Sequence, residues 1–261
     1  MNNYEKIEKI AQEGFELEFG TVLDNAIKNY KQIFGVAGIS MLILMMALFT
    51  LLFGTIGVIY GFSGFSENMA NFNPLMLGGA FVVLYLVSII VFSGVMAVIN
   101  AGFYKMCHLA HNNQSFSVGT MFDYFKSKHF KELFLSGVLV SALTGTVSLL
   151  FEYLDLKVLG MLLTYLISYL VFLTITLIIF SDLKAMEAIS MSIKLSLKNP
   201  LVLIGLLIVG GILAMLGIIA LCIGIFFTLP FIYSMVYSIY NEIVPVEEVN
   251  VLDEIGTNHS E

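Results

Sequence analysis

Five long stretches without a charged residue divide this sequence, and they constrain the fold more than any other feature. The stretches are Val36–Tyr60, Leu75–Phe103, Leu133–Leu150, Val158–Phe180 and Leu201–Asn241. An apolar run of about 18 residues or more can cross a hydrocarbon core of ~30 Å as a helix. Backbone groups in lipid must bond to one another, which favours helices. The sequence therefore predicts an all-α, polytopic membrane helix bundle.

The last stretch is too long for one crossing. As a single helix, Leu201–Asn241 would extend about 62 Å, twice the thickness of a bilayer core. Helix-breaking residues lie between Gly217 and Pro230, around Cys222 and Gly224. We expect a turn there, at the outer interface. This gives about six transmembrane helices in three hairpins.

Charge is scarce and all basic residues are lysines. Only 12% of the 261 residues are charged, against about 25% in soluble domains. Without Arg, bidentate phosphate or carboxylate recognition is excluded. No lysine run is long enough to indicate a nucleic-acid partner. The first nineteen residues lack an apolar core, so they do not form a signal peptide.

The lysines define an orientation. With six spans, eleven lysines share one side and only Lys157 lies on the other. The eleven are Lys6, Lys9, Lys28, Lys31, Lys105, Lys126, Lys128, Lys131, Lys184, Lys194 and Lys198. Positive residues favour the cytoplasmic side. We therefore expect a multi-pass protein of the bacterial cytoplasmic (inner) membrane with both termini in the cytoplasm.

The same topology divides the chain into three parts. Residues 1–19 form an acidic cytoplasmic segment, 20–241 the six-helix transmembrane domain, and 242–261 an acidic cytoplasmic tail that we expect to be disordered. The connections at Gly61–Pro74 and Glu152–Lys157 should share the outer side with the turn near Gly224.

A short motif recurs before the first and third spans. Gly20-Thr21-x-x-Asp24 is repeated as Gly119-Thr120-x-x-Asp123. Threonine is a good N-cap, and an acidic residue three positions later can complete a capping box. We expect Thr21 and Thr120 to be N-caps, with helices beginning within two residues of each.

Amphipathic segments precede each hairpin. The expected apolar stripes are Val22, Leu23, Ala26, Ile27, Tyr30 and Ile33; Met121, Phe122, Phe125 and Leu133; and Ala185, Ala188, Ile189 and Ile193. The opposing polar residues are Asp24, Asn25, Lys28, Asn29 and Gln32 in the first segment, and Glu187, Ser190, Lys194 and Lys198 in the third. Such helices lie at the membrane surface and attract anionic lipids. Alternatively, they are only the cytoplasmic ends of the following spans.

Three segments of the sequence resemble a known group of proteins. They are Glu18-Phe19-Gly20 to Phe34, Ala188–Ser192 to Leu201, and Gly224–Pro230. Together they resemble uncharacterised bacterial membrane families (domains of unknown function), including the membrane domain attached to some glycerophosphodiester phosphodiesterases. The resemblance covers about Phe19 to Tyr240. It implies six helices and no established activity.

Residues with reactive side chains are few. Cys107, His108 and His111 form the one cluster of candidate metal ligands, with His129 further along. A metal site needs three or four ligands, so we interpret this cluster as an ordinary interfacial segment. We expect Cys107 and Cys222 to be unpaired. No catalytic, cofactor-binding or metal-binding residue is predicted.

The spans contain hydroxyls and small residues but no central charge, which disfavours ion-coupled transport. We expect the hydroxyls to bond within or between helices. They are Ser141, Thr144, Thr146, Ser148, Thr164, Ser168, Thr174 and Thr176. The pairs Gly57/Gly61 and Gly210/Ala214 should allow close helix packing.

The leading functional hypothesis is a non-enzymatic membrane protein that organises lipid or binds a membrane protein partner. The alternative is a passive transporter or lipid-binding protein, which a cavity lined by Ser, Thr and Tyr would favour. A membrane enzyme is the least supported class.

Overall fold

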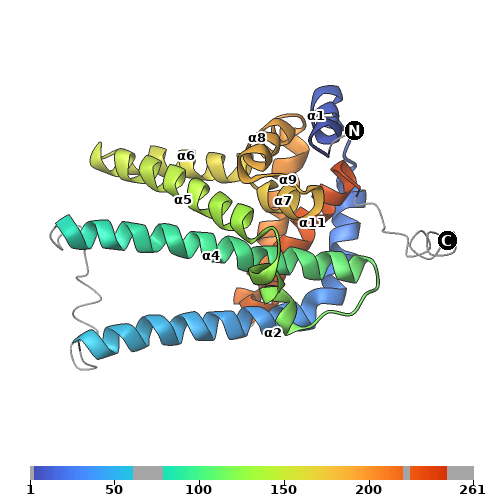
Figure 1. Ribbon diagram of the computed structural model, residues 1–261. Coiled ribbons are helices and arrows are strands. Elements are labelled where there is room, and N and C mark those ends of the chain that lie inside the picture. Colours follow the sequence, from blue (N-terminus) through green and yellow to red (C-terminus); the bar gives the residue numbers. More distant parts are fainter. Residues whose placement is uncertain (1–2, 61–78, 220–223, 246–261) are drawn as a thin grey trace, which may run out of the picture.

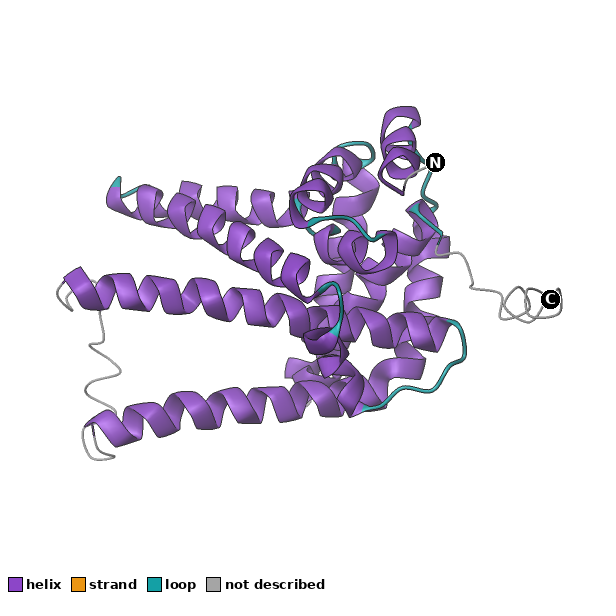
Figure 2. Cartoon of the chain, in the orientation of Figure 1, coloured by secondary structure: helices purple, strands orange, loops and turns teal. Residues whose placement is uncertain are grey.

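The computed structural model describes residues 3–60, 79–219 and 224–245, and within these ranges all regular structure is helical (Figure 2). The elements are α1 (Asn3–Glu13), α2 (Phe19–Tyr60), α4 (Gly79–His111), the 3₁₀ helix η2 (Val118–Lys126), α5 (Phe130–Tyr153), α6 (Lys157–Leu170), α7 (Thr174–Ser181), α8 (Ala185–Ser196), α9 (Pro200–Met215), the 3₁₀ turn η3 (Leu216–Ile218), α10 (Gly224–Thr228) and α11 (Pro230–Ile243). The all-α prediction is confirmed.

Among the described residues, five helical segments are long and apolar enough to cross a membrane. They are Phe19–Leu51, Val87–His111, Phe130–Tyr153, Lys157–Ser181 and Pro200–Ile219. The short helices α10 and α11, which correspond to the expected sixth span, are not among them. The fold is therefore that of a multi-pass helical membrane protein, and a sixth crossing stays a prediction.

The first amphipathic segment is the beginning of α2 rather than a separate helix. This part of α2 runs in a clearly different direction from the long remainder (Figure 1). Val22, Ala26 and Ile33 are fully buried, as the apolar stripe predicted, and Lys28 is exposed. The placement of Asn29 on the polar face is wrong, because this side chain is 4% exposed. Its polar partners lie on other helices, which helical spacing alone does not reveal.

The last hairpin, α9 to α11, packs against α2. It lies at the end of the molecule that carries the lysines predicted to be cytoplasmic, such as Lys28, Lys105 and Lys194, and this end is called the lysine-bearing end below. The Tyr30 hydroxyl donates to the Phe227 carbonyl at 3.1 Å, and the Phe227 ring packs directly over Gly38. Gly38 is the third residue of the predicted first span. Helix α10, which begins at Gly224, therefore lies beside the start of this span, whereas residues 220–223 of the turn expected at the outer side lie outside the described residues.

Helix α11 is largely buried by the helices around it. Ten of its fourteen residues are buried, and among them Tyr237 and Tyr240 are each 1% exposed. The beginning of α2, the end of α4, α9 and α10 pack around this helix. Gly210 and Ala214 of α9 are buried, and a Cβ added to Gly210 would lie 3.2 Å from Met235 Cγ. The predicted close contact at Gly210/Ala214 is confirmed, whereas Gly57/Gly61 lies outside the described side chains.

The repeated motif marks helix starts, but with a different geometry from the one predicted. Helices begin at Phe19 and Val118, two residues before the threonines. Neither Thr21 nor Thr120 is an N-cap, since each is the third helical residue. The Thr21 hydroxyl donates to the Glu18 carboxylate at 2.7 Å. The Ser117 backbone N–H donates to Thr120 Oγ1 at 3.1 Å.

The third amphipathic segment has a matching start. The backbone N–H of Lys184 donates to Glu187 Oε2 at 3.0 Å, again joining the residue before the helix to the third helical residue. A side chain at the third position that bonds back in this way closes the first turn. The second segment differs in being a 3₁₀ helix, and its Phe122 and Phe125 are exposed rather than part of a buried stripe.

The fourth span is broken between α6 and α7. Ser192 of α8 donates to the Leu170 carbonyl at 2.9 Å and accepts a hydrogen bond from the Leu173 N–H at 3.1 Å. Ser196 also donates to the Leu170 carbonyl, at 3.2 Å. Irregular backbone at membrane depth is tolerated where protein covers it. Ser192 and Ser196, on the buried face of α8, therefore hydrogen-bond the Leu170 carbonyl and the Leu173 N–H at the break.

Candidate functional site

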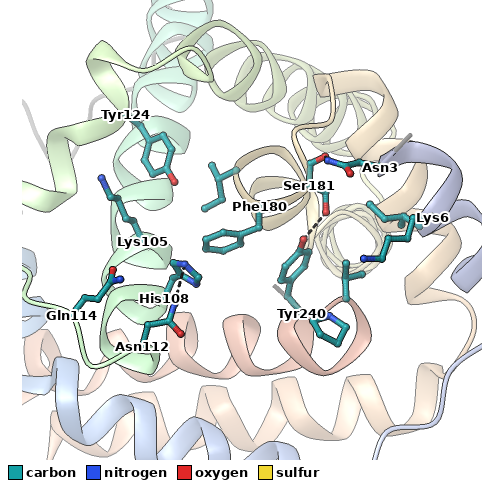
Figure 3. A pocket seen from close by; sticks show the side chains of 14 residues that line it. Asn3, Lys6, Lys105, His108, Asn112, Gln114, Tyr124, Phe180, Ser181 and Tyr240 are labelled. Atoms are coloured by element: carbon teal, nitrogen blue, oxygen red, sulfur yellow. Dashed lines mark hydrogen bonds between the residues drawn. The ribbon is translucent and has the colours of Figure 1, made fainter. Parts of the chain in front are cut away.

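A polar cleft of about 730 Å³ opens at the lysine-bearing end of the molecule (Figure 3). Its walls come from α1, α4, α7 and α11, with η2 at one edge. The lining residues are Asn3, Lys6, Ile7, Lys105, His108, Asn112, Gln114, Tyr124, Ile179, Phe180, Ser181, Tyr240, Val244 and Pro245. The cleft therefore joins segments from both ends and the middle of the chain.

Helix α1 forms one wall, and the sequence analysis did not predict it. Ile7 and Ala11 are buried at 1% and 3% exposure, which fits an apolar face of helical spacing. At the edge of this face, Lys194 Nζ of α8 lies 2.9 Å from Glu8 Oε1. Asn3 Nδ2 donates to the Ser181 carbonyl at 3.0 Å. The sequence predicted only an acidic cytoplasmic segment for residues 1–19. This segment contains the short helix α1, which packs on α8.

Lys6 and Lys105 line the cleft, and the Lys105 ammonium group is paired with the Asp123 carboxylate. Lys105 Nζ lies 2.7 Å from Asp123 Oδ2 and 5.9 Å from the centre of the Tyr124 ring. Burial, with a smaller effect from Asp123, raises the pKa of Tyr124 above its ordinary value. Its hydroxyl therefore stays protonated at neutral pH and can donate a hydrogen bond. None of the described residues lining the cleft carries a carboxylate.

His108 is held by neutral partners. Its Nε2 lies 3.2 Å from Asn112 Nδ2, and its Nδ1 lies 3.1 Å from the Tyr237 hydroxyl. Because an amide nitrogen only donates, Nε2 accepts from Asn112, and in neutral His108 the proton lies on Nδ1. The ring is thereby fixed in the wall of the cleft.

The other residues considered as metal ligands, Cys107, His111 and His129, do not line the cleft. Cys107 is buried and free, and the His111 ring packs on Tyr237 with centroids 5.9 Å apart. His129 lies elsewhere, with Nδ1 3.6 Å from Asp182 Oδ1. Among the described residues, no three His, Cys, Asp or Glu side chains converge on a common point. Cys222 lies outside the described residues.

Hydrogen bonds and ring packing connect the residues at the back of the cleft. The Ser181 and Tyr240 hydroxyls are hydrogen-bonded at 2.5 Å, and Phe180 packs on Tyr240 with ring centroids 5.5 Å apart. Near His108, Asn29 Nδ2 donates to the Cys107 carbonyl at 2.7 Å, and Asn29 Oδ1 accepts from the Ser234 hydroxyl at 2.8 Å. These bonds fix α2, α4 and α11 relative to one another. The arrangement offers ammonium groups and neutral donors in a preformed cleft, which suits an anion.

A second, smaller cavity of about 350 Å³ lies between α4, α5 and the break before α7. Its lining residues are Ser93, Met96, Ala97, Asn100, Ser136, Gly137, Val140, Ser141, Thr144, Val171, Thr174 and Ile175. Most of its polar groups are hydroxyls, and none of these lining residues is ionisable.

Comparisons with family models, with curated proteins and with solved structures give no match to this chain. The resemblance to membrane domains of glycerophosphodiester phosphodiesterases therefore stays a prediction from the sequence. Functional inference rests on the two cavities and on the charge of the lysine-bearing end.

Proposed function

We propose that this chain is a non-enzymatic membrane protein that binds anionic lipid headgroups at its lysine-bearing end, and so organises lipid or a membrane partner there. The observation that carries this proposal is the preformed cleft that contains Lys6 and Lys105. Lysine ammonium groups near a bilayer surface attract anionic headgroups. Amide and hydroxyl donors such as Asn112, Gln114 and Tyr124 can bond the remaining oxygens of a phosphoryl group.

The membrane and the orientation belong to the same proposal. Six spans in a bacterial cytoplasmic membrane would place eleven lysines and both termini in the cytoplasm, under the positive-inside tendency. Single cysteines at Ser66 and Ser127, in a background without Cys107 and Cys222, should then react with membrane-impermeant reagents from opposite sides. Labelling of both positions from one side would contradict the six-span topology.

Headgroup binding is tested by lipid retention. Native mass spectrometry would compare phosphatidylglycerol with phosphatidylcholine on the purified protein. The double variant Lys6→Gln/Lys105→Gln should lose phosphatidylglycerol preference by about tenfold or more, since each lysine contributes about 1 kcal/mol of attraction. Lys157→Gln is the matched control, because Lys157 lies at the opposite end beside Glu152, at 4.0 Å.

The result can contradict the proposal in two ways. Equal loss in Lys157→Gln would mean that overall charge, rather than the cleft, governs retention. An unchanged preference in the double variant would exclude the cleft as the site. A thermal unfolding curve for each variant separates a lost site from a lost fold. Turnover of a lipid by the purified protein would overturn the non-enzymatic assignment.

A second candidate function is passive passage of an uncharged lipid-like solute. The hydroxyl-lined cavity between α4, α5 and α7 favours it. Proteoliposomes with a fluorescent neutral lipid in one leaflet would test it, since a transporter should speed exchange between leaflets. Exchange at the rate of protein-free liposomes would contradict this candidate.

A further inference from the structure

The cavity between α4, α5 and α7 lies among membrane-spanning segments. Its walls belong to the spans Val87–His111, Phe130–Tyr153 and Lys157–Ser181. Two of its polar lining residues, Ser93 and Thr144, directly follow apolar residues in the sequence. These apolar residues, Phe92 and Leu143, are exposed. A molecule that enters from the bilayer could therefore keep its apolar part on the outer faces of these helices.

Most hydroxyls of the spans are already satisfied by their own helix. Ser136 donates to the Leu133 carbonyl at 2.8 Å, and Thr144 to the Val140 carbonyl at 2.9 Å. Bonds of the same kind are made by Thr146, Thr164, Ser168 and Thr176. This is the behaviour predicted for hydroxyls in membrane helices.

Among the buried side chains in the described part of the chain, Thr174 is the exception. Its side chain is 3% exposed, and its Oγ1 has no hydrogen-bond partner within the described part of the chain. A buried hydroxyl without a partner costs about 1–3 kcal/mol. Thr174 also lines the cavity, at the first residue of α7.

The broken backbone next to Thr174 does not require its hydroxyl. The Leu170 carbonyl and the Leu173 N–H both bond to Ser192, and the Thr174 N–H itself donates to the Val171 carbonyl at 3.1 Å. The Leu170 carbonyl, the Leu173 N–H and the Thr174 N–H thus have partners without the Thr174 hydroxyl. That hydroxyl belongs to a residue that lines a cavity large enough for a ligand.

We propose that this cavity binds the glycerol and ester groups of an uncharged lipid of the diacylglycerol class, with Thr174 as a hydrogen-bonding residue. No lining residue is ionisable, so a charged headgroup would be desolvated without compensation. The volume of about 350 Å³ accommodates a glycerol backbone with its esters rather than a whole lipid. This site is independent of the anionic cleft, since it shares no residue with it.

The test measures binding of dioleoylglycerol to the purified full-length protein, by native mass spectrometry and by the thermal shift that it causes. Wild-type protein should bind and be stabilised. Thr174→Val replaces the hydroxyl with a methyl group of similar size and should weaken binding about five- to tenfold. Ser141→Leu should fill the cavity and remove the shift. Thr146→Val is the matched control, because its exposed hydroxyl bonds to the Ala142 carbonyl and does not line the cavity.

A readout without lipid distinguishes binding from folding. Because Thr174 Oγ1 is unpartnered, Thr174→Val should unfold at the same temperature as wild type or higher when lipid is absent. The inference is overturned if dioleoylglycerol gives no shift in the wild type, or if Thr146→Val weakens binding as much as Thr174→Val. An equal effect of free glycerol would overturn the lipid assignment. Loss of the shift in Lys6→Gln/Lys105→Gln, with Thr174→Val unaffected, would place the lipid in the cleft instead.

Discussion

The two ends of the molecule are packed in opposite ways. In α11, at the lysine-bearing end, ten of fourteen residues are buried, whereas in α5 only Leu133 and Ser136 of 24 are. The α5–α6 hairpin and the far ends of α2 and α4 project from the packed end as separate arms (Figure 1). Apolar residues on these arms, such as Leu150 and Val158, are exposed and suited to lipid.

This difference shows where the specific interactions lie. Lipid tails are as apolar as leucine, so apolar surface alone gives membrane helices little reason to choose one neighbour over another. Polar contacts and close approaches supply that choice, and they concentrate at the lysine-bearing end. Variants at that end should therefore destabilise the fold more than chemically matched variants on the arms or on exposed faces.

The largest effect is expected at Asn29. Asn29→Ala removes the amide that joins the Cys107 carbonyl to Ser234, and leaves that buried carbonyl without this partner. The expected loss of unfolding free energy is about 3 kcal/mol. Asn25→Ala, on the same helix but half-exposed, should change it by less than about 1 kcal/mol. Denaturant unfolding in detergent measures both, and equal losses would contradict the buried role of Asn29.

A glycine pair compares the two regions directly. A Cβ at Gly102 would overlap the backbone of Met121 in η2, whereas one at Gly145 on the α5 arm would meet nothing within 4 Å. Gly102→Ala should cost about 2 kcal/mol through overpacking. Gly145→Ala should stabilise α5 by up to about 1 kcal/mol. Opposite shifts of the unfolding midpoint are expected, and a stabilised Gly102→Ala would contradict the close contact.

The break in the fourth span gives a smaller effect. Ser192→Ala leaves the Leu173 N–H without its partner, although Ser196 still donates to the Leu170 carbonyl. A loss of about 1–2 kcal/mol is expected. Ser190→Ala, on the exposed face of α8, should be near neutral. Hydrogen exchange at Leu173 should also become faster in Ser192→Ala, and unchanged exchange would show that α8 does not hold the break.

The smallest effect belongs to the ion pair between α8 and α1. Lys194→Gln removes the 2.9 Å contact with Glu8, and exposed pairs contribute only about 0.2–1 kcal/mol. The hydrogen bond that Lys194 donates to Glu8 raises the pKa of Lys194, so the pair's contribution is lost as the pH rises from the ordinary lysine pKa through this raised value. Proteolysis of α1 should be slightly faster in Lys194→Gln than in the wild type, and this difference should be larger at low salt than at high salt. Lys184→Gln should show no such difference. No salt dependence would contradict the role of the pair.

The candidate sites show how far sequence reasoning reached. Lys105, His108 and the hydroxyls of the spans were recognised as individual residues, and most of those hydroxyls bond as predicted. The cleft itself was not predicted, because α1 and α11 supply parts of its walls from opposite ends of the chain. Thr174 looks like its neighbours in sequence, and only its surroundings leave its hydroxyl without a partner.

The sequence by itself determined the class of fold. Uncharged runs longer than a bilayer core require helices in lipid, and residue spacing identified the buried stripe of Val22, Ala26 and Ile33. Tertiary structure decided the contact of the last two helices with α2 and the burial of Asn29. The physical reason is that hydropathy and spacing report how each helix partitions between water, lipid and protein. Which helices then touch depends on a few hydrogen bonds and close contacts, such as Phe227 on Gly38, between residues nearly two hundred positions apart.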